Sequence, residues 1–293
     1  MALAIGSGGC SIKKMAINTL GNALAEGTSG FAKDDDPELV RDAVPFALKT
    51  IESLIDESPQ HRGLLTAACS GFTQYAYAFI QMEADYVEAQ DLDRATQMRA
   101  RAKKLYVRAL NYGMRALELD HPGFRARLRS EGDAVLAKTT KKDVALLYWT
   151  SAAWSAAFAV DVTDSQLSVD QTLMEKMMRR ALALDESWDQ GALHDFFISW
   201  EAGHASAGGS IEKAREHFAR AKALSGGQRL SPFVSYAEAV SLNEQNKKEF
   251  EELLKGVVGA DAAALQPNQR LVNLIAQRRA AWLLSRVDQL FIE

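Results

Sequence analysis

Two long stretches of the chain carry apolar residues at the alternating three- and four-residue spacing of an α-helix, and no other feature limits the fold as strongly. The first stretch contains Leu65, Ala68, Phe72, Tyr75, Phe79, Met82 and Tyr86. The second contains Ala95, Met98, Ala102, Leu105, Ala109, Tyr112, Ala116 and Leu119. This second pattern predicts a helix of about 29 residues, roughly 43 Å long at 1.5 Å per residue. We expect the two seams to face each other in an antiparallel hairpin, with alanine against aromatic side chains.

A second pattern places a small, a bulky and a small residue at positions i, i+4 and i+7, as in the second helix of a tetratricopeptide repeat. Its clearest copy is Ala214, Phe218 and Ala221, and looser copies begin at Ala47, Ala109, Met174 and Asn246. The starting positions lie 62, 65, 40 and 32 residues apart, so the repeat is degenerate and interrupted. Such helix pairs bury their faces only against neighbouring pairs. The sequence therefore predicts an all-α, solenoid-like domain of degenerate tetratricopeptide-like helical hairpin repeats over residues 34–293.

Composition supports a helical chain and excludes several classes of partner. Strand-type alternation of Val, Ile and Thr is nearly absent, and only 6 of the 293 residues are proline. The chain has 34 basic and 38 acidic side chains, a net charge of −4, so its surface has no general attraction for nucleic acid or anionic membranes. It also contains no run of 18 apolar residues that could span a bilayer as a helix.

The stretch "DDDPELVRDAVPFALKTIESLIDESP" raises the question whether three consecutive aspartates form a metal site. Asp36 followed by Pro37 is typical of an N-cap and the first position of a helix. No further oxygen ligands lie at suitable spacing, so we interpret the aspartates as a helix start. We expect Pro45 to kink or restart this helix and Pro59 to end it.

Three other segments have simple interpretations. The stretch "DVALLYWTSAAWSAAFAV" is apolar on nearly every face, which predicts a central helix covered on all sides. The polar residues 161–170 that follow are expected to form a loop. A last helix is expected to start after Pro267 and to end near Phe291.

The two cysteines lie in different surroundings. Cys69, in "LLTAACSGF", is expected to be a buried, inert thiol. Cys10 follows "MALAIGSGG", which resembles the end of a bacterial lipoprotein signal, although Ser7 stands where leucine is usual and no basic region precedes it. We interpret residues 1–33 as a flexible N-terminus with the remnant of such a signal and Cys10 as the lipid attachment site. The alternative is a glycine-rich start with an incidental thiol.

Four arginines recur every seven residues along the second long helix: Arg94, Arg101, Arg108 and Arg115. On a helix they form one row, which we name the arginine rail. The functional interpretation is a basic edge that binds a partner protein or an anionic ligand. The alternative is a solvated face whose arginines pair with acids and cover apolar surface with their aliphatic stems.

The sequence gives little support to a metal site or a catalytic site. His194, Glu201, His204, Glu212 and His217 include one Glu-x-x-His spacing, but a di-iron bundle needs a second copy and further carboxylates. No nucleophile elbow, glycine-rich phosphate loop or zinc-protease motif is present in the sequence. We therefore predict neither a metal nor a cofactor and no enzymatic activity.

Aromatic side chains on the central helix are the candidates for a ligand cavity. Tyr148, Trp149 and Trp154 lie there with Ser151 and Ser155 between them, a combination that can surround an apolar ligand with a polar group. Together with Tyr75 of the first seam they are our candidate cavity residues. The same side chains can equally be core residues.

A family resemblance rests on blocks that occur in a fixed order. These are "DDDPELVRDAVPFALKTIESL", "SPQHRGLL", "QYAYAF", "RARAKKLYVRALNYGMRALE", "LLYWTSAAW", "GALHDF" and "RLVNLIAQRRAAWLL" followed by "VDQLF". In this order they resemble the T-component family of tripartite ATP-independent periplasmic (TRAP) transporters, which are tetratricopeptide-like lipoproteins of Gram-negative bacteria. The resemblance covers nearly the whole chain, from about Asp34 to Phe291.

The resemblance implies a function that the residues alone do not give. It implies a periplasmic protein held to the membrane only by an N-terminal lipid, which docks the solute-binding subunit of the transporter and relays a hydrophobic ligand. It also implies self-association, as trimers, and no catalytic residue. Two other functions remain open: a free-standing carrier of lipids or small molecules, and an enzyme on a helical scaffold.

Overall fold

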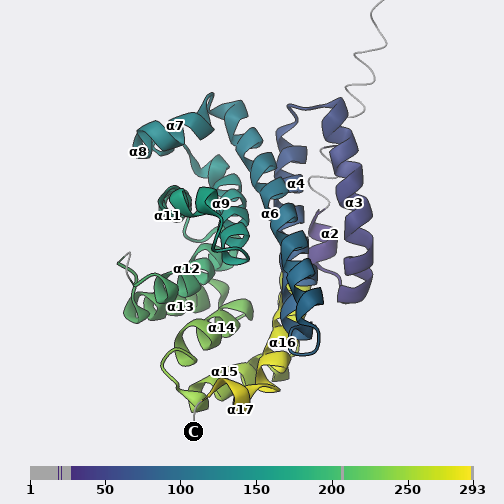
Figure 1. Cartoon of the computed structure of the whole chain (residues 1–293), viewed down its shortest axis with the longest axis vertical. Helices are drawn as coiled ribbons and strands as arrows, with labels where there is room; N and C mark the ends of the chain where they lie inside the picture. Colours follow the sequence, from purple (N-terminus) through teal and green to yellow (C-terminus); the bar gives the residue numbers. More distant parts are fainter. Residues whose placement is uncertain (1–18, 20, 22–27, 206–207, 292–293) are drawn as a thin grey trace, which may run out of the picture.

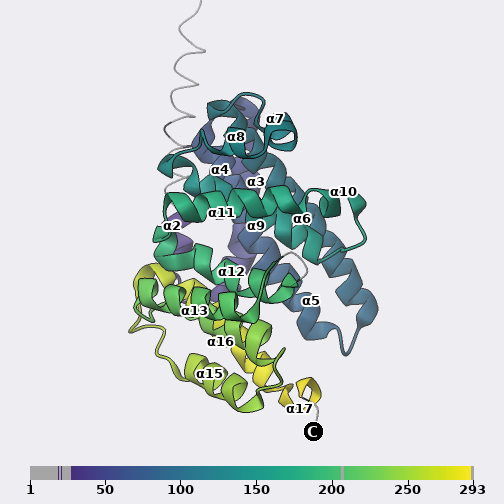
Figure 2. The same ribbon diagram turned by 90° about the vertical axis from the view of Figure 1, so that its left-hand side faces the viewer.

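The computed structural model describes residues 19, 21, 28–205 and 208–291. Within these residues the chain forms helices and no β-strand (Figure 1). The prediction of an all-α protein is therefore confirmed. Figure 2 shows that the chain descends the long axis of the molecule from α7 and α8 through α12 and α13 to α15.

The N-terminal part is a layer of long helices. It comprises α2 (Thr28–Ala32), α3 (Pro37–Glu57), α4 (Arg62–Ala76), the π-helical turn η1 (Tyr77–Gln81), α5 (Met82–Val87) and α6 (Leu92–Asp120). Helix α6 has 29 residues, as predicted. It packs against α4, where the rings of Phe72 and Tyr112 stack with centroids 6.2 Å apart. The predicted pairing of the two seams is thus confirmed.

The middle of the chain surrounds one apolar helix. The helices are α7 (Phe124–Glu131), α8 (Asp133–Leu136), η2 (Lys141–Asp143), α9 (Val144–Ala159), α10 (Ser165–Val169), α11 (Gln171–Leu184), η3 (Trp188–Gly191), α12 (Ala192–Gly203) and α13 (Ile211–Ser225). Helix α9 packs against α4, α6 and α11, so it is central as predicted, but the face with Tyr148, Trp149 and Ala152 is only half-buried and the helix is not covered on all sides.

The C-terminal helices return to the N-terminal ones. They are α14 (Ser231–Tyr236), the π-helical turn η5 (Ala237–Ser241), α15 (Lys247–Gly259), η6 (Pro267–Gln269), α16 (Arg270–Leu284) and α17 (Val287–Leu290). Helix α16 lies beside α2 and α3 and behind α6 in Figure 1. Arg278 forms ion pairs with Glu38 at 3.1 Å and with Glu83 at 2.7 Å. Helix α16 is therefore joined directly to α3 and α5 of the N-terminal layer.

The start of α3 confirms the interpretation of the aspartates. Asp36 caps the helix, because its Oδ1 accepts hydrogen bonds from the backbone N–H groups of Glu38 and Leu39, each at 3.0 Å. The helix does not restart at Pro45, since α3 continues through it. The helix loses one backbone hydrogen bond there, but the buried side chains Leu48 and Ile51 hold the next turns against the core.

Two further boundaries differ from the predictions. Residues 161–170 contain α10, whose first turn is capped by Asp164 accepting from the N–H groups of Gln166 and Leu167. The last helix is interrupted between α16 and α17, where the Ser285 hydroxyl donates to the carbonyl of Trp282 at 2.6 Å. Both differences come from side chains that satisfy backbone groups locally.

The copies of the small–bulky–small pattern lie on α3, α6, α11, α13 and α15. In the looser copy that begins at Asn246, this residue is the N-cap of α15 and accepts from the Glu249 N–H at 3.2 Å. The tetratricopeptide-like description of these helices stays a prediction. Cys69 is fully buried between α4, α6 and α9, and burial raises the pKa of its thiol to about 12, which confirms an inert thiol.

Candidate functional site

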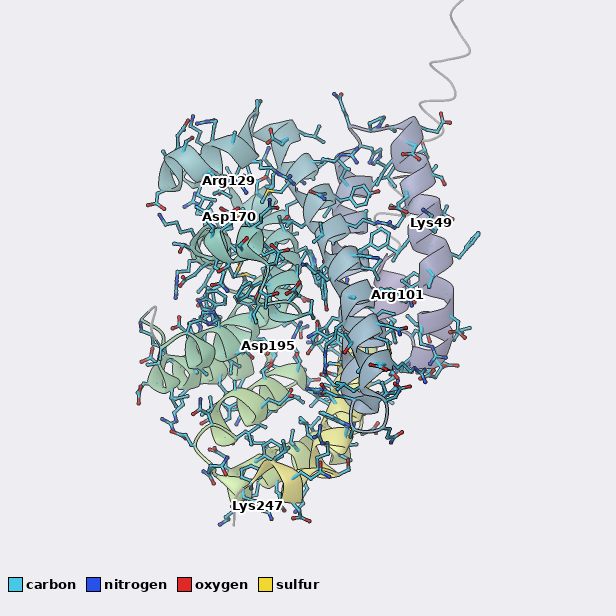
Figure 3. All side chains as sticks on the ribbon, viewed as in Figure 1. Lys49, Arg101, Arg129, Asp170, Asp195 and Lys247 are labelled. Carbon is cyan, nitrogen blue, oxygen red and sulfur yellow. The ribbon has the colours of Figure 1, made fainter. Side chains whose placement is uncertain are left out.

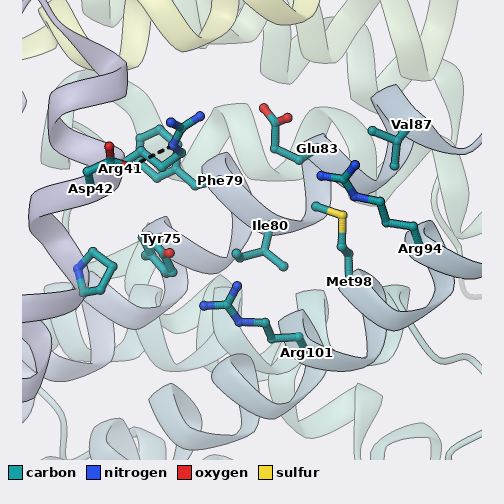
Figure 4. A pocket seen from close by; sticks show the side chains of 11 residues that line it. Arg41, Asp42, Tyr75, Phe79, Ile80, Glu83, Val87, Arg94, Met98 and Arg101 are labelled. Carbon is teal, nitrogen blue, oxygen red and sulfur yellow. Dashed lines mark hydrogen bonds and ion pairs between the residues drawn. The ribbon is translucent and has the colours of Figure 1, made fainter. Parts of the chain in front are cut away.

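A groove of about 470 Å³ lies between α3 and α6, above α4, η1 and α5 (Figure 4). We name it the arginine groove. It is lined by Arg41, Asp42, Pro45, Tyr75, Phe79, Ile80, Glu83, Val87, Arg94, Met98 and Arg101. Arg94 and Arg101 reach into it from α6, opposite Arg41 and Asp42 of α3, with Ile80 between the two walls. The structure thus brings Tyr75 of the predicted cavity together with the first half of the arginine rail.

The two walls of the arginine groove differ in how their charges are balanced. On α3, Arg41 pairs with Glu38 and, at 3.1 Å, with Asp42. Arg94 and Arg101 are exposed, and across the described residues neither guanidinium forms an ion pair or a side-chain hydrogen bond. The wall formed by α6 therefore presents two positive charges without an intramolecular partner.

The second half of the arginine rail has partners within the chain. Arg108 lies 3.5 Å from the Glu52 carboxylate and 5.3 Å from the centroid of the Phe72 ring. Arg115 donates to the carbonyl of Pro59 at 3.3 Å and lies over the ring of Tyr112. These contacts tie α6 to the C-terminal half of α3. Arg108 and Arg115 therefore have a structural role. Arg94 and Arg101, which have no side-chain partner among the described residues, we name the free pair.

A smaller cavity, of about 130 Å³, lies where α4, η1 and α5 meet α14, η5 and α16. We name it the central hollow. It is lined by Gln74, Tyr77, Ala78, Met82, Ser231, Val234, Ser235, Glu238, Val272, Ile275, Ala276 and Arg279. Both π-helical turns, η1 and η5, contribute to its wall, and such turns occur frequently at functional sites. Its wall is mainly apolar, with a few polar side-chain groups at its surface.

The charged residues of the central hollow are neutralised by one another. Arg279 binds Glu238 at 2.6 Å and Asp85 at 3.0 Å, and lies 4.5 Å from the ring of Trp282. Tyr77 is 46% exposed, yet it is surrounded by the walls of the hollow, and this desolvation raises the pKa of its hydroxyl well above the usual range. The hollow can therefore hold an apolar molecule with an uncharged polar group.

A buried polar network that the sequence did not reveal supports the same region. Arg229 is 7% exposed and lies 2.9 Å from Asp189. Asp195 accepts hydrogen bonds from the hydroxyls of Ser231, at 2.5 Å, and Ser235, at 2.7 Å. Figure 3 marks Asp195 near the middle of the molecule and Arg101 between α6 and α3. Arg229 lies in a segment that reads as an ordinary connection, so no sequence signal identified it.

The four predicted cavity residues do not form one cavity. Tyr148 and Trp149 are half-buried and form a cluster with Trp188, with ring centroids 4.7 to 6.4 Å apart. Trp154 is 6% exposed and belongs to the core, where its indole N–H has no hydrogen-bond partner among the described residues. Tyr75 lines the arginine groove instead.

The histidines considered as metal ligands have other roles. His194 Nδ1 lies 2.8 Å from His217 Nδ1, and His204 stacks on Trp200 with centroids 3.7 Å apart. Glu201 binds Arg179 at 2.7 Å. In the described part of the chain, no three His, Cys, Asp or Glu side chains are arranged to hold a metal ion.

The structure provides no helix that combines the length and the apolar surface needed to cross a bilayer, among the residues that it describes. Cys10, the predicted lipid attachment site, lies outside the described residues.

Comparison with known proteins identifies the family of the chain. Residues 33–291 match the family described as "TRAP transporter T-component". A protein of Treponema pallidum (strain Nichols), named only "Uncharacterized protein", is 30% identical over 304 residues, which cover 97% of this chain and 94% of the relative. The match extends over almost every helix described above. The chain therefore belongs to the TRAP transporter T-component family.

Proposed function

We propose that the protein is a non-enzymatic adaptor in the periplasm, which docks the solute-binding subunit of a TRAP transporter and relays an apolar ligand. Family membership supports a role in such a transporter. We further propose that it works as a homo-oligomer, a trimer by the family resemblance. The arginine rail, through Arg94 and Arg101, is the proposed contact with the subunit.

The central hollow is the observation that carries the proposed relay. It has an apolar wall with a few polar tips, and its ion pairs are internally balanced, as expected for a site that takes an uncharged or weakly polar ligand. The rival function, a carrier that works without a transporter, would use the same hollow but would need no docking partner.

A pull-down of the full-length tagged protein from native membranes tests the docking role. Recovery of the solute-binding subunit, identified by mass spectrometry, supports the adaptor. Recovery of the protein alone, with a bound lipid or small molecule, contradicts it and supports the free-standing carrier.

The relay predicts that filling the central hollow abolishes ligand binding. Indole is a suitable probe, because cavities of about 150 Å³ bind small aromatic molecules. At ten times its dissociation constant, it should stabilise the wild-type protein by about 1.4 kcal/mol in differential scanning calorimetry. The variant Ala78→Trp should show no such gain, because the new ring occupies the hollow. Ala126→Trp, on the exposed face of α7, is the matched control and should keep the gain.

The proposed membrane attachment depends on Cys10. Residues 28–32 of the predicted N-terminal segment form α2, which packs against α16, so we propose the residues before α2 as a tether for the helical domain, with a lipid on Cys10. The native protein should incorporate labelled palmitate and sediment with membranes, whereas Cys10→Ala should appear in the soluble periplasmic fraction. Membrane sedimentation of the unlabelled Cys10→Ala variant would contradict the lipid anchor.

A further inference from the structure

The free pair of the arginine rail lines the arginine groove opposite Arg41 and Asp42 of α3. At the other end of these helices, Glu52 joins them, because it accepts from the Tyr112 hydroxyl at 2.8 Å and pairs with Arg108. No such contact joins the walls through Arg94 or Arg101 among the described residues, so these two side chains can meet a segment of another molecule.

Charge at the arginine groove does not balance. Its lining contains three arginines against two carboxylates, Asp42 and Glu83. Asp42 is bound by Arg41, and Glu83 is bound by Arg278, which lies outside the groove. The excess positive charge is therefore that of Arg94 and Arg101, on a chain whose net charge is −4. A ligand of this groove must supply negative charge.

The helices that form the two walls also expose large apolar side chains. Phe46, which follows the groove residue Pro45 in α3, is 80% exposed, and Leu39 is 59% exposed. Leu92, in the first turn of α6, is 63% exposed. None of the three lines the groove itself, but exposed apolar side chains on the same two helices are typical of a surface that contacts another protein.

We infer that the arginine groove docks an acidic segment of the solute-binding subunit, in which two carboxylates about 10 Å apart flank an apolar side chain. The separation follows from the position of Arg101 seven residues after Arg94, which is a rise of about 10.5 Å along a helix. The two carboxylates pair with the two guanidinium groups, and the apolar side chain lies between them against Met98 and Ile80. This inference rests on the proposed function, since it assigns the docking surface of the adaptor.

Zero-length cross-linking tests the inference directly. Arg94→Lys and Arg101→Lys keep the positive charge and provide amines that a carbodiimide joins only to carboxylates in direct contact. The full-length variants are mixed with the purified solute-binding subunit of the same organism's TRAP transporter, and the linked peptides are sequenced by mass spectrometry. We expect each new lysine to be joined to an aspartate or glutamate of one acidic segment. Lys138, exposed after α8, is the internal control and should not be joined.

Charge reversal gives the second readout. Arg94→Glu with Arg101→Glu should weaken binding of the subunit at least tenfold, whereas Lys138→Glu should leave the dissociation constant unchanged. The inference is wrong if the wild-type protein binds the subunit, the charge reversal leaves the dissociation constant unchanged, and neither new lysine is cross-linked. The adaptor role would then still stand. If wild-type protein binds no subunit, the proposed function fails and the inference fails with it.

Discussion

Replacing Gly113 by alanine should destabilise the protein by about 3 kcal/mol, as expected for overpacking at a closed helix crossing. Gly113 lies on α6 where this helix crosses both α4 and α9. A β-carbon there would overlap the Thr150 hydroxyl and lie 2.8 Å from Cys69 Sγ. All three residues are buried, so the neighbours cannot move aside without disturbing the core.

The same substitution elsewhere should have the opposite effect, which makes it a matched control. Gly256 lies inside α15, and a β-carbon there would meet nothing within 4 Å. Gly256→Ala should therefore stabilise the protein by about 0.5 to 1 kcal/mol, because alanine loses less backbone freedom on folding. Urea unfolding followed by circular dichroism measures both changes.

A double variant identifies the cause. If the overlap with Thr150 produces the loss, the double variant Gly113→Ala with Thr150→Ala should lose less unfolding free energy than the two single variants together. We expect a difference of about 1 kcal/mol. Strict additivity would contradict a steric origin. A neutral Gly113→Ala would show that α6 does not need a small residue at this crossing.

Local order was predicted from the sequence because its causes are local. The cap at Asp36, the 29 residues of α6 and the central position of α9 all follow from spacing within one helix. Pro45 shows the limit of such reasoning. A proline disfavours a helix locally, but burial of Leu48 and Ile51 against other helices outweighs this preference.

The candidate sites were predicted only in part, because their partners are distant in the chain. Seven-residue spacing placed the arginine rail on one face, but only the fold brings Glu52 to Arg108, 56 residues away, and leaves Arg101 free. On α9, an apolar pattern on every face could not separate Tyr148 from Trp154. One joins Trp188, and the other joins the core.

A pair of histidines gives the second large expected effect, a loss of stability in mild acid. His194 on α12 and His217 on α13 share a hydrogen bond of 2.8 Å between their Nδ1 atoms. One ring must donate and the other must accept, so the bond requires that at least one ring be neutral. Desolvation, together with the positive charges of His194 and Arg179, lowers the pKa of His217 from 6.5 to about 4.

The charged residues around the two histidines raise and lower their pKa values. Burial also lowers the pKa of His194, while the hydrogen bond that its Nε2 donates to Glu186 raises this pKa, and the charge of Arg220 lowers it. Arg220 holds the pKa of Glu186 at about 2, so this carboxylate stays ionised throughout mild acid. Its own contribution to stability is lost only as pH falls from about 4.5 towards 2, below the window of His217.

The direction of the effect follows from proton binding. The folded-state pKa of His217 lies below its unfolded value, so between pH 6.5 and about 4 the unfolded chain binds more protons than the folded one. Stability is therefore complete above pH 6.5 and falls as pH decreases to about 4. At 1.36 kcal/mol per pKa unit the loss is about 2 to 3 kcal/mol, allowing for the partial exposure of the ring.

The variant His217→Gln separates this pair from the other titrating groups. Glutamine can still donate a hydrogen bond to His194, but it takes up no proton. Urea unfolding of both proteins at several pH values from 7 to 4 should show a clearly smaller loss of stability in the variant. The two curves should run in parallel below pH 4, where carboxylates such as Glu186 take over. Equal slopes between pH 6.5 and 4 would mean that protonation of His217 is not what weakens the contact between α12 and α13.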